Sequence, residues 1–252
     1  MPGLPNSRRQ IARAKEHAVD LKRKFDTFWN THEQIPFFEH DPHRSDHETF
    51  KIRITHPIPL DSYADSAHDA VINLRSALDS AGYALAIGSG NNRLKSTGFP
   101  FANSADELEN QIKGRSKDIP EEIYPTFRAY QPYRGGNDTL WALNEACNAH
   151  KHQGLVRLDT GTVLGNFIGT GGIVKLLSPP RWDSIKQEIE CGTFVKGSEV
   201  HCYVEIGTFV AFDKIEVIGG EPLLPVLDYF IEIVEHIIST LEIEGARLGF
   251  LK

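Results

Sequence analysis

The sequence predicts an α+β protein with a helical N-terminal layer, an antiparallel β-meander and an amphipathic C-terminal helix. Up to about residue 152, apolar residues recur at helical spacing in several long segments. After that point, short apolar runs such as GIVKLL alternate with glycines, which is typical of antiparallel strands. A last amphipathic helix is expected from Pro222 to about Arg247.

The chain shows no internal repeat and no low-complexity linker. Its 252 residues are enough for a sizeable core. We therefore expect a single domain over residues 1–252, with the helical layer at about 1–152 and the meander plus terminal helix at about 153–252.

Composition narrows the functional class. Hydrophobic residues make up 40% and charged residues 24%, as in ordinary globular proteins. The net charge of −7 argues against a surface that binds nucleic acid everywhere, although it is compatible with a local basic patch. The N-terminus lacks the apolar core of a signal peptide, and no apolar run approaches the ~20 residues of a membrane span. Three cysteines make no disulfide framework. We expect a cytoplasmic, reduced protein with no membrane partner.

The helical layer can be divided by its periodicity and its start signals. The predicted helices cover residues 6–31, about 61–87, 105–112, about 121–130 and 138–152. Ser104 and Glu107 have the spacing of a capping box, which predicts reciprocal hydrogen bonds at the start of the third helix.

Two strand assignments carry a register. The segment FKIRI alternates Phe50, Ile52 and Ile54 on one face, which predicts a strand. If Lys196-Gly197 is a two-residue hairpin turn, Ile189 pairs with Val204 and Cys191 with Cys202. The two thiols would then face each other, either as small core residues or as a redox or soft-metal site. No further ligands lie nearby in the sequence.

The polar loop EHDPHRSDH brings histidines and aspartates together. Imidazole and carboxylate at this density could hold a divalent ion. The spacing matches no known metal pattern, so we expect a polar loop, no metal and no cofactor. The residues concerned are His40, Asp41, His43, Asp46 and His47.

A polar stripe marks the helix predicted at 138–152. Glu145, Asn148 and His152 are spaced three and four apart, so they share one face, and Lys151 lies beside them. A carboxylate, an amide and an imidazole on one stripe could support general acid–base chemistry. Equally, cationic Lys151 and His152 could interact favourably with the negative end of the helix dipole at the C-terminus, without any catalytic role.

Arg75 and Asp79 lie one turn apart in an otherwise apolar helix. An exposed pair of this kind contributes about 0.3–0.5 kcal/mol, whereas a buried pair needs further partners. Gly82, on the same edge, would let another backbone approach closely. We therefore expect this edge to face another element or another subunit, with Arg75 and Asp79 forming a polar pair.

Several motifs together resemble an uncharacterised bacterial family. They are NLRSALDSAGYALA, GFPF, YQPYRG and LWALNEACNAHKHQGL, and they lie within residues 69–155. The family pattern ends N-x-D-K-H-R; here Asn148, Lys151 and His152 match, while His150 and Gln153 differ. The family has no settled activity to imply.

A remoter resemblance is to HEPN-type helical proteins, which use an arginine, four intervening residues and a histidine near a dimer interface to cleave RNA without metal. Arg75 matches the arginine, but Ser80 stands where the pattern has histidine. Serine is no general base near pH 7, so His152 would have to supply the imidazole. The resemblance implies a homodimer and RNA as a partner.

Two functions therefore stay open, and the residues do not decide whether the protein is an enzyme. The first is a non-enzymatic binding or interaction module, in which Arg75, Asp79 and the helix carrying Asn148 form a polar layer. The second is a metal-independent ribonuclease, active or lapsed. There Arg75 would stabilise the phosphorane charge, Asp79 would orient it and His152 would move the proton. Glu145, Asn148 and Lys151 would serve binding. The serine at position 80 favours the first function.

Overall fold

The computed structural model describes the backbone of residues 3–41, 43–92, 94–149, 156–170, 172–213 and 215–251. Side chains are described for these residues except 149, 156–170, 178–179 and 199–210. The predicted α+β class is confirmed, with N-terminal helices, antiparallel strands and a C-terminal helix. No helix in these described ranges is long and apolar enough to cross a bilayer.

The chain divides into two compact units, and each is built from separate stretches of sequence. The helical unit comprises Met1–Arg23, Asp61–Leu155 and Phe212–Lys252. The strand unit comprises Lys24–Leu60 and Val156–Ala211. One boundary, between Leu155 and Val156, falls close to residue 153, where the character of the sequence changes. The units nevertheless interleave, because residues 24–60 belong to the strand unit and residues 212–252 to the helical unit. Whether the two units fold as the single domain expected from the sequence stays a prediction.

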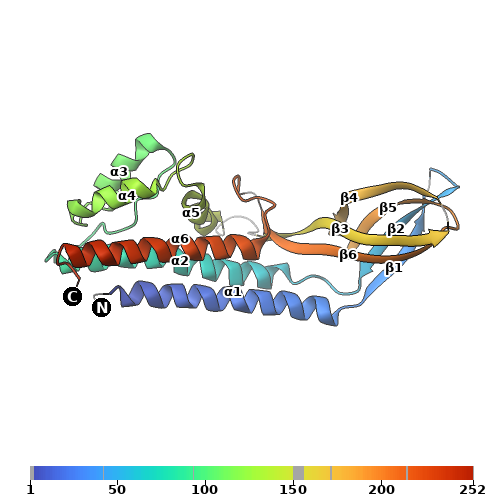
Figure 1. Ribbon diagram of the computed structural model, residues 1–252, viewed down its shortest axis with the longest axis horizontal. Helices are drawn as coiled ribbons and strands as arrows, with labels where there is room; N and C mark the ends of the chain where they lie inside the picture. Colours follow the sequence, from blue (N-terminus) through green and yellow to red (C-terminus); the bar gives the residue numbers. More distant parts are fainter. Residues whose placement is uncertain are drawn as a thin grey trace. The chain divides into compact units, whose positions relative to one another are not determined.

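Three long helices lie side by side in the helical unit (Figure 1). They are α1 (Pro5–Thr31), of which residues 5–23 belong to this unit, α2 (Leu60–Gly88) and α6 (Leu223–Arg247). Arg8 pairs with Glu242 and Lys15 with Glu235, so α1 and α6 run in opposite directions. The Ser7 hydroxyl donates to the Ala77 carbonyl at 2.8 Å and binds α1 to α2.

The apolar stripes predicted for these helices form the core. Helical periodicity predicts one inward stripe on each helix, and on α6 this stripe is Leu227, Phe230, Ile233, Ile237 and Leu241. The whole predicted stripe of α2 is buried. On α6 only Ile233 differs, because it is half-buried while Val234 takes the inner position. Periodicity alone places these residues, because only one face of each helix is apolar enough to leave water. The buried stripe of α2 is Val71, Leu74, Leu78, Ala81 and Leu85.

Shorter helices complete this unit. They are α3 (Ala105–Arg115), the 3₁₀ turn η1 (Glu121–Ile123), α4 (Tyr124–Tyr130) and α5 (Asp138–Ala149). The predicted capping box is not formed: the Ser104 side chain makes no cap bond, and Glu107 accepts the N–H of Asn103 at 3.1 Å, one residue before the N-cap. The last predicted residues of α5, His150 to His152, lie outside the described residues.

The strand unit holds an antiparallel sheet of order β1-β2-β5-β4 (Figure 1). These strands are β1 (Gln34–His40), β2 (His47–Ile54), β5 (Glu188–Val195) and β4 (Ile173–Asp183), while β3 (Val156–Thr170) pairs with β6 (Glu199–Phe212). The alternation of Phe50, Ile52 and Ile54 is confirmed, because all three side chains are buried. The order of the strands in the sheet therefore differs from their order in the chain. The first two residues of the predicted polar loop, at 39 and 40, belong to β1 instead.

The predicted pairing of Ile189 with Val204 and of Cys191 with Cys202 is wrong. Both edges of β5 are taken, by β2 and by β4, so β6 cannot pair with it. The turn itself is present, because the Ser198 N–H donates to the Val195 carbonyl and Gly197 has φ of +77°. The alternation of apolar and polar residues on β5 fixes which face of the strand is buried, but it does not select the neighbouring strand. The Cys202 side chain lies outside the described residues.

Gly82 of α2 confirms the expected close approach. A Cβ at this position would lie 2.3 Å from the carbonyl oxygen of Thr97 and 2.7 Å from a methyl carbon of Ile119. Ile119 belongs to the loop that follows α3, and Thr97 belongs to the segment that follows α2. Only glycine allows this segment to lie directly on the helix.

We expect Gly82→Ala to destabilise the protein by about 1–3 kcal/mol, because the added methyl group meets backbone that cannot turn aside. The measurement is the free energy of unfolding from urea titration, followed by circular dichroism.

The matched control is Gly114→Ala in α3, where an added Cβ meets nothing within 4 Å. Alanine there should stabilise by about 0.5–1 kcal/mol, since it only raises helix propensity. Equal free energies for the two variants would contradict the close approach at Gly82.

Candidate functional site

Arg75 of α2 is held by uncharged groups. The central carbon of its guanidinium group lies 5.4 Å from the ring centroid of Phe101, and its Nη1 donates to Asn148 Oδ1 of α5 at 3.4 Å. The side chain is half-buried. None of the ion pairs among the described residues involves Arg75. The structure thus brings together two residues that the sequence predicted to act on neighbouring helices.

Asp79 turns to other partners. Its Oδ1 accepts the backbone N–H of Phe99 at 2.7 Å, and its Oδ2 lies 3.5 Å from Arg115 Nη2. The expected pair of Arg75 with Asp79 is therefore not formed. The backbone N–H and Arg115 already satisfy the carboxylate, so Asp79 fixes the segment around Phe99 and leaves Arg75 without it.

Arg75 also acts on the Cys147 thiol. Burial raises the pKa of Cys147 to about 11, and the nearby positive charge of Arg75 opposes this only in part. The sulfur lies 3.5 Å from the Val71 carbonyl oxygen. A thiol with so high a pKa is protonated at neutral pH, so Cys147 is no nucleophile there.

The remaining predicted site residues are only partly placed. Glu145 is half-buried, and its carboxylate accepts the side-chain amide of Asn144 at 3.4 Å. Ser80 is half-buried on α2. Lys151 and His152 lie outside the described residues. The structure therefore brings Arg75 to Asn148 but leaves the position of the proposed imidazole open.

The histidine loop connects β1 to β2, and hydrogen bonds within the loop hold it. The His43 N–H donates to Asp41 Oδ1 at 2.8 Å, and His47 Nδ1 lies 2.8 Å from Asp46 Oδ1. In the part of the chain that the structure describes, no group of three or more histidine, cysteine or acidic side chains has metal-site geometry.

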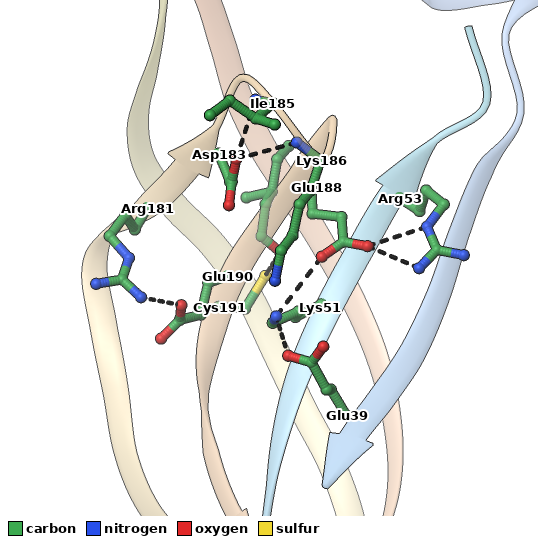
Figure 2. A network of polar contacts seen from close by, with 11 residues as sticks. Glu39, Lys51, Arg53, Arg181, Asp183, Ile185, Lys186, Glu188, Glu190 and Cys191 are labelled. Carbon is green, nitrogen blue, oxygen red and sulfur yellow. Dashed lines mark hydrogen bonds and ion pairs between the residues drawn. The ribbon is translucent and has the colours of Figure 1, made fainter. Parts of the chain in front are cut away.

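A second polar cluster lies on one face of the sheet in the strand unit, and sequence reasoning missed it (Figure 2). The Lys51 ammonium on β2 lies between the carboxylates of Glu39 and Glu188. Arg53 donates two hydrogen bonds to Glu188 Oε1, at 3.0 and 2.7 Å. We call these residues, with the Arg181–Glu190 pair beside them, the charged cluster: Glu39, Lys51, Arg53, Arg181, Glu188 and Glu190.

Register explains this cluster. Glu188 lies opposite Arg53 on β2, and Glu190 lies opposite Lys51, so their side chains share a face. The polar members of FKIRI alternate with its buried members, which was visible in the sequence. Their partners on β5 were not, because β2 and β5 lie far apart along the chain.

The cluster mixes buried and exposed charges. Only 8% of Lys51 and 5% of Glu188 is exposed to solvent. Burial alone would lower the pKa of Lys51, but the hydrogen bond that Lys51 donates to Glu39 and the charges of both carboxylates raise it overall. The hydrogen bond from Lys51 in turn lowers the pKa of Glu39. The pair therefore adds stability above pH 4.5 and below pH 10.5, and loses it outside these limits.

No family model, curated protein or solved structure matches this chain. The likeness to the uncharacterised bacterial family and to HEPN-type proteins therefore stays a prediction from the motifs alone.

We expect iodoacetamide to label Cys147 slowly at pH 8.5 and to reach half its limiting rate only near pH 11. Peptide mass spectrometry after short pulses measures the rate for this residue alone. The chain unfolded in urea is the control and should titrate near pH 8.5. Matching profiles for folded and unfolded chains would contradict a buried Cys147.

We expect Lys51→Met to destabilise the protein by about 3 kcal/mol, because it leaves the buried Glu188 carboxylate with less compensating charge. Arg181→Met is the control, since 74% of the Arg181 side chain is exposed and its pair is worth about 0–1 kcal/mol. Urea unfolding at neutral pH measures both. A smaller loss for Lys51→Met than for Arg181→Met would show that burial does not set the strength of these pairs.

Proposed function

We propose that this protein is a non-enzymatic binding module that holds a phosphate group of single-stranded RNA at Arg75. The observation that carries the proposal is the Arg75 guanidinium group, which is positioned by Phe101 and Asn148 and has no carboxylate partner among the described residues.

A comparison within the chain supports this reading of Arg75. Arg53 lies over the ring of Phe37 and Arg134 over that of Trp141, and each of these arginines also pairs with a glutamate. Arg75 has the same ring contact without the carboxylate. Its charge is thus available, and its fork of donors suits a phosphate.

The choice of RNA rests on the HEPN likeness and on general chemistry. Single-stranded RNA is bound by arginine together with aromatic groups, and a local cation can act on a chain whose net charge is −7. A cytoplasmic location is part of the proposal, as is a homodimer. Support for a partner surface comes from α2, where Ile72, Tyr83 and Ile87 are 41%, 54% and 45% exposed.

One observation favours the second candidate, a metal-independent ribonuclease. Asn148 contacts Arg75, and His152 follows Asn148 by four positions in the sequence. Arg75 would stabilise the charge that develops on phosphorus, and His152 would transfer the proton. Asp79 would act by holding the segment under Arg75, given its bond to Phe99.

We expect Arg75→Ala to weaken binding of a fluorescent single-stranded RNA by about 10-fold or more, because a charged hydrogen bond contributes about 1.5–3 kcal/mol. Fluorescence anisotropy in EDTA measures the dissociation constant. Arg128→Ala is the matched control, since Arg128 is exposed and pairs with Glu109, and it should leave affinity unchanged.

The same RNA on a denaturing gel separates the two candidates. Intact RNA bound by the wild type supports the binding module. Cleavage lost in both Arg75→Ala and His152→Ala replaces it with the ribonuclease. RNA that stays intact and unbound, or intact RNA that Arg75→Ala binds as tightly as the wild type does, rejects both functions. Circular dichroism confirms that each variant is folded.

A further inference from the structure

A hollow of about 330 Å³ opens beside the charged cluster in the strand unit. It is lined by the buried residues Lys51 and Glu188 and by the exposed residues Asp183, Ile185 and Lys186, which form its rim. Figure 2 shows these five residues. Pockets of this size take small molecules. The other lining residues are Arg181, Trp182, Ser184 and Glu190.

One atom in this hollow is incompletely satisfied. Glu188 Oε1 accepts two hydrogen bonds from Arg53, but Oε2 is buried and accepts none. Its nearest charge is Lys51 Nζ, at 3.5 Å. A buried acceptor without a donor costs about 1–3 kcal/mol, and more when the group is charged. Glu188 Oε2 is therefore suited to accept an N–H donor from a ligand.

A free cation lies on the rim of the same hollow. Among the described residues, no carboxylate lies within ion-pair distance of the Lys186 ammonium group, although its charge acts from farther away on Glu39 and Asp183. The backbone here is fixed, because Asp183 Oδ1 accepts the N–H groups of Ile185 and Lys186, each at 3.0 Å. Lys186 can thus receive an anionic group of a ligand.

The balance of charge selects the ligand class. Three basic side chains, Lys51, Arg181 and Lys186, face three acidic ones, Asp183, Glu188 and Glu190. A ligand with net charge would upset this balance, whereas a zwitterion would not. Lys186 and Glu188 are two positions apart, so their Cα atoms lie at most about 7 Å from each other. A small ligand can reach both.

We propose that this hollow binds a free α-amino acid with an apolar side chain. The ammonium group donates to Glu188 Oε2, the carboxylate accepts from Lys186, and the side chain packs on Trp182 and Ile185. This site lies in the strand unit and does not depend on the function proposed for Arg75.

Calorimetric titration with L-leucine tests the proposal. Two analogues separate the charged groups: isopentylamine lacks the carboxylate, and 4-methylpentanoic acid lacks the amine. Because each missing group removes a charge-assisted hydrogen bond, both should bind at least about 10-fold more weakly than leucine.

Lys186→Met should weaken leucine about 10-fold and leave isopentylamine unchanged. Its matched control is Lys196→Met, since Lys196 is exposed in the same unit but does not line the hollow. Glu188→Gln should remove the preference for leucine over 4-methylpentanoic acid. Because Glu188 is buried, circular dichroism first checks that Glu188→Gln is folded. If Glu188→Gln unfolds, the result for Lys186→Met alone decides the proposal.

Three results would overturn the proposal. The first is no heat from leucine at millimolar concentration, which would leave Glu188 Oε2 to water. The second is isopentylamine binding as tightly as leucine, which would make the hollow a plain cation site. The third is unchanged leucine affinity in Lys186→Met.

Discussion

The contact of the Thr97 carbonyl with Gly82 is the constraint on which the Arg75 site depends. With any residue other than glycine at position 82, the segment after α2 could not lie flat on that helix. The added Cβ would lie 2.3 Å from the Thr97 carbonyl oxygen. Once the segment is there, the Phe99 N–H reaches Asp79 and the Phe101 ring lies under Arg75. One missing side chain thus positions the whole polar edge of α2.

The two polar sites differ in how their charges are compensated. In the charged cluster, each buried charge has an opposite charge beside it, as the low polarity of a protein interior requires. At Arg75 the neighbours are a ring and an amide, and the helix surface leaves the guanidinium half in water. The first arrangement stabilises the sheet, whereas the second leaves a charge available to a ligand.

Glu188 combines a fully compensated oxygen with a less compensated one. One of its oxygens accepts two hydrogen bonds from Arg53, while the other is buried, accepts no hydrogen bond and lies 3.5 Å from the Lys51 ammonium group. The split follows from geometry, because both Arg53 donors reach the same oxygen. A residue that is structural on one side can therefore be a recognition group on the other.

Much of the helical unit could be predicted, because a helix satisfies its own backbone and shows its buried face as a local period. The stripe of α2, the strand alternation around Ile52 and the closeness demanded by Gly82 were all visible in this way. The capping box at Ser104 failed, since the Ser104 side chain makes no cap bond and Glu107 accepts the N–H of Asn103 instead of that of Ser104. The pair of Arg75 and Asp79 failed because Asp79 had partners far along the chain that no local pattern records.

The sequence by itself determined the α+β class, the helices and the inward faces of the strands, because all of these follow from interactions within a few residues. Only the tertiary structure decided that β5 lies between β2 and β4, that Glu188 meets Lys51, and that Arg75 meets Asn148. The physical reason is the same in each case. An alternating strand or a polar side chain accepts many partners equally well, and packing of the whole chain selects one.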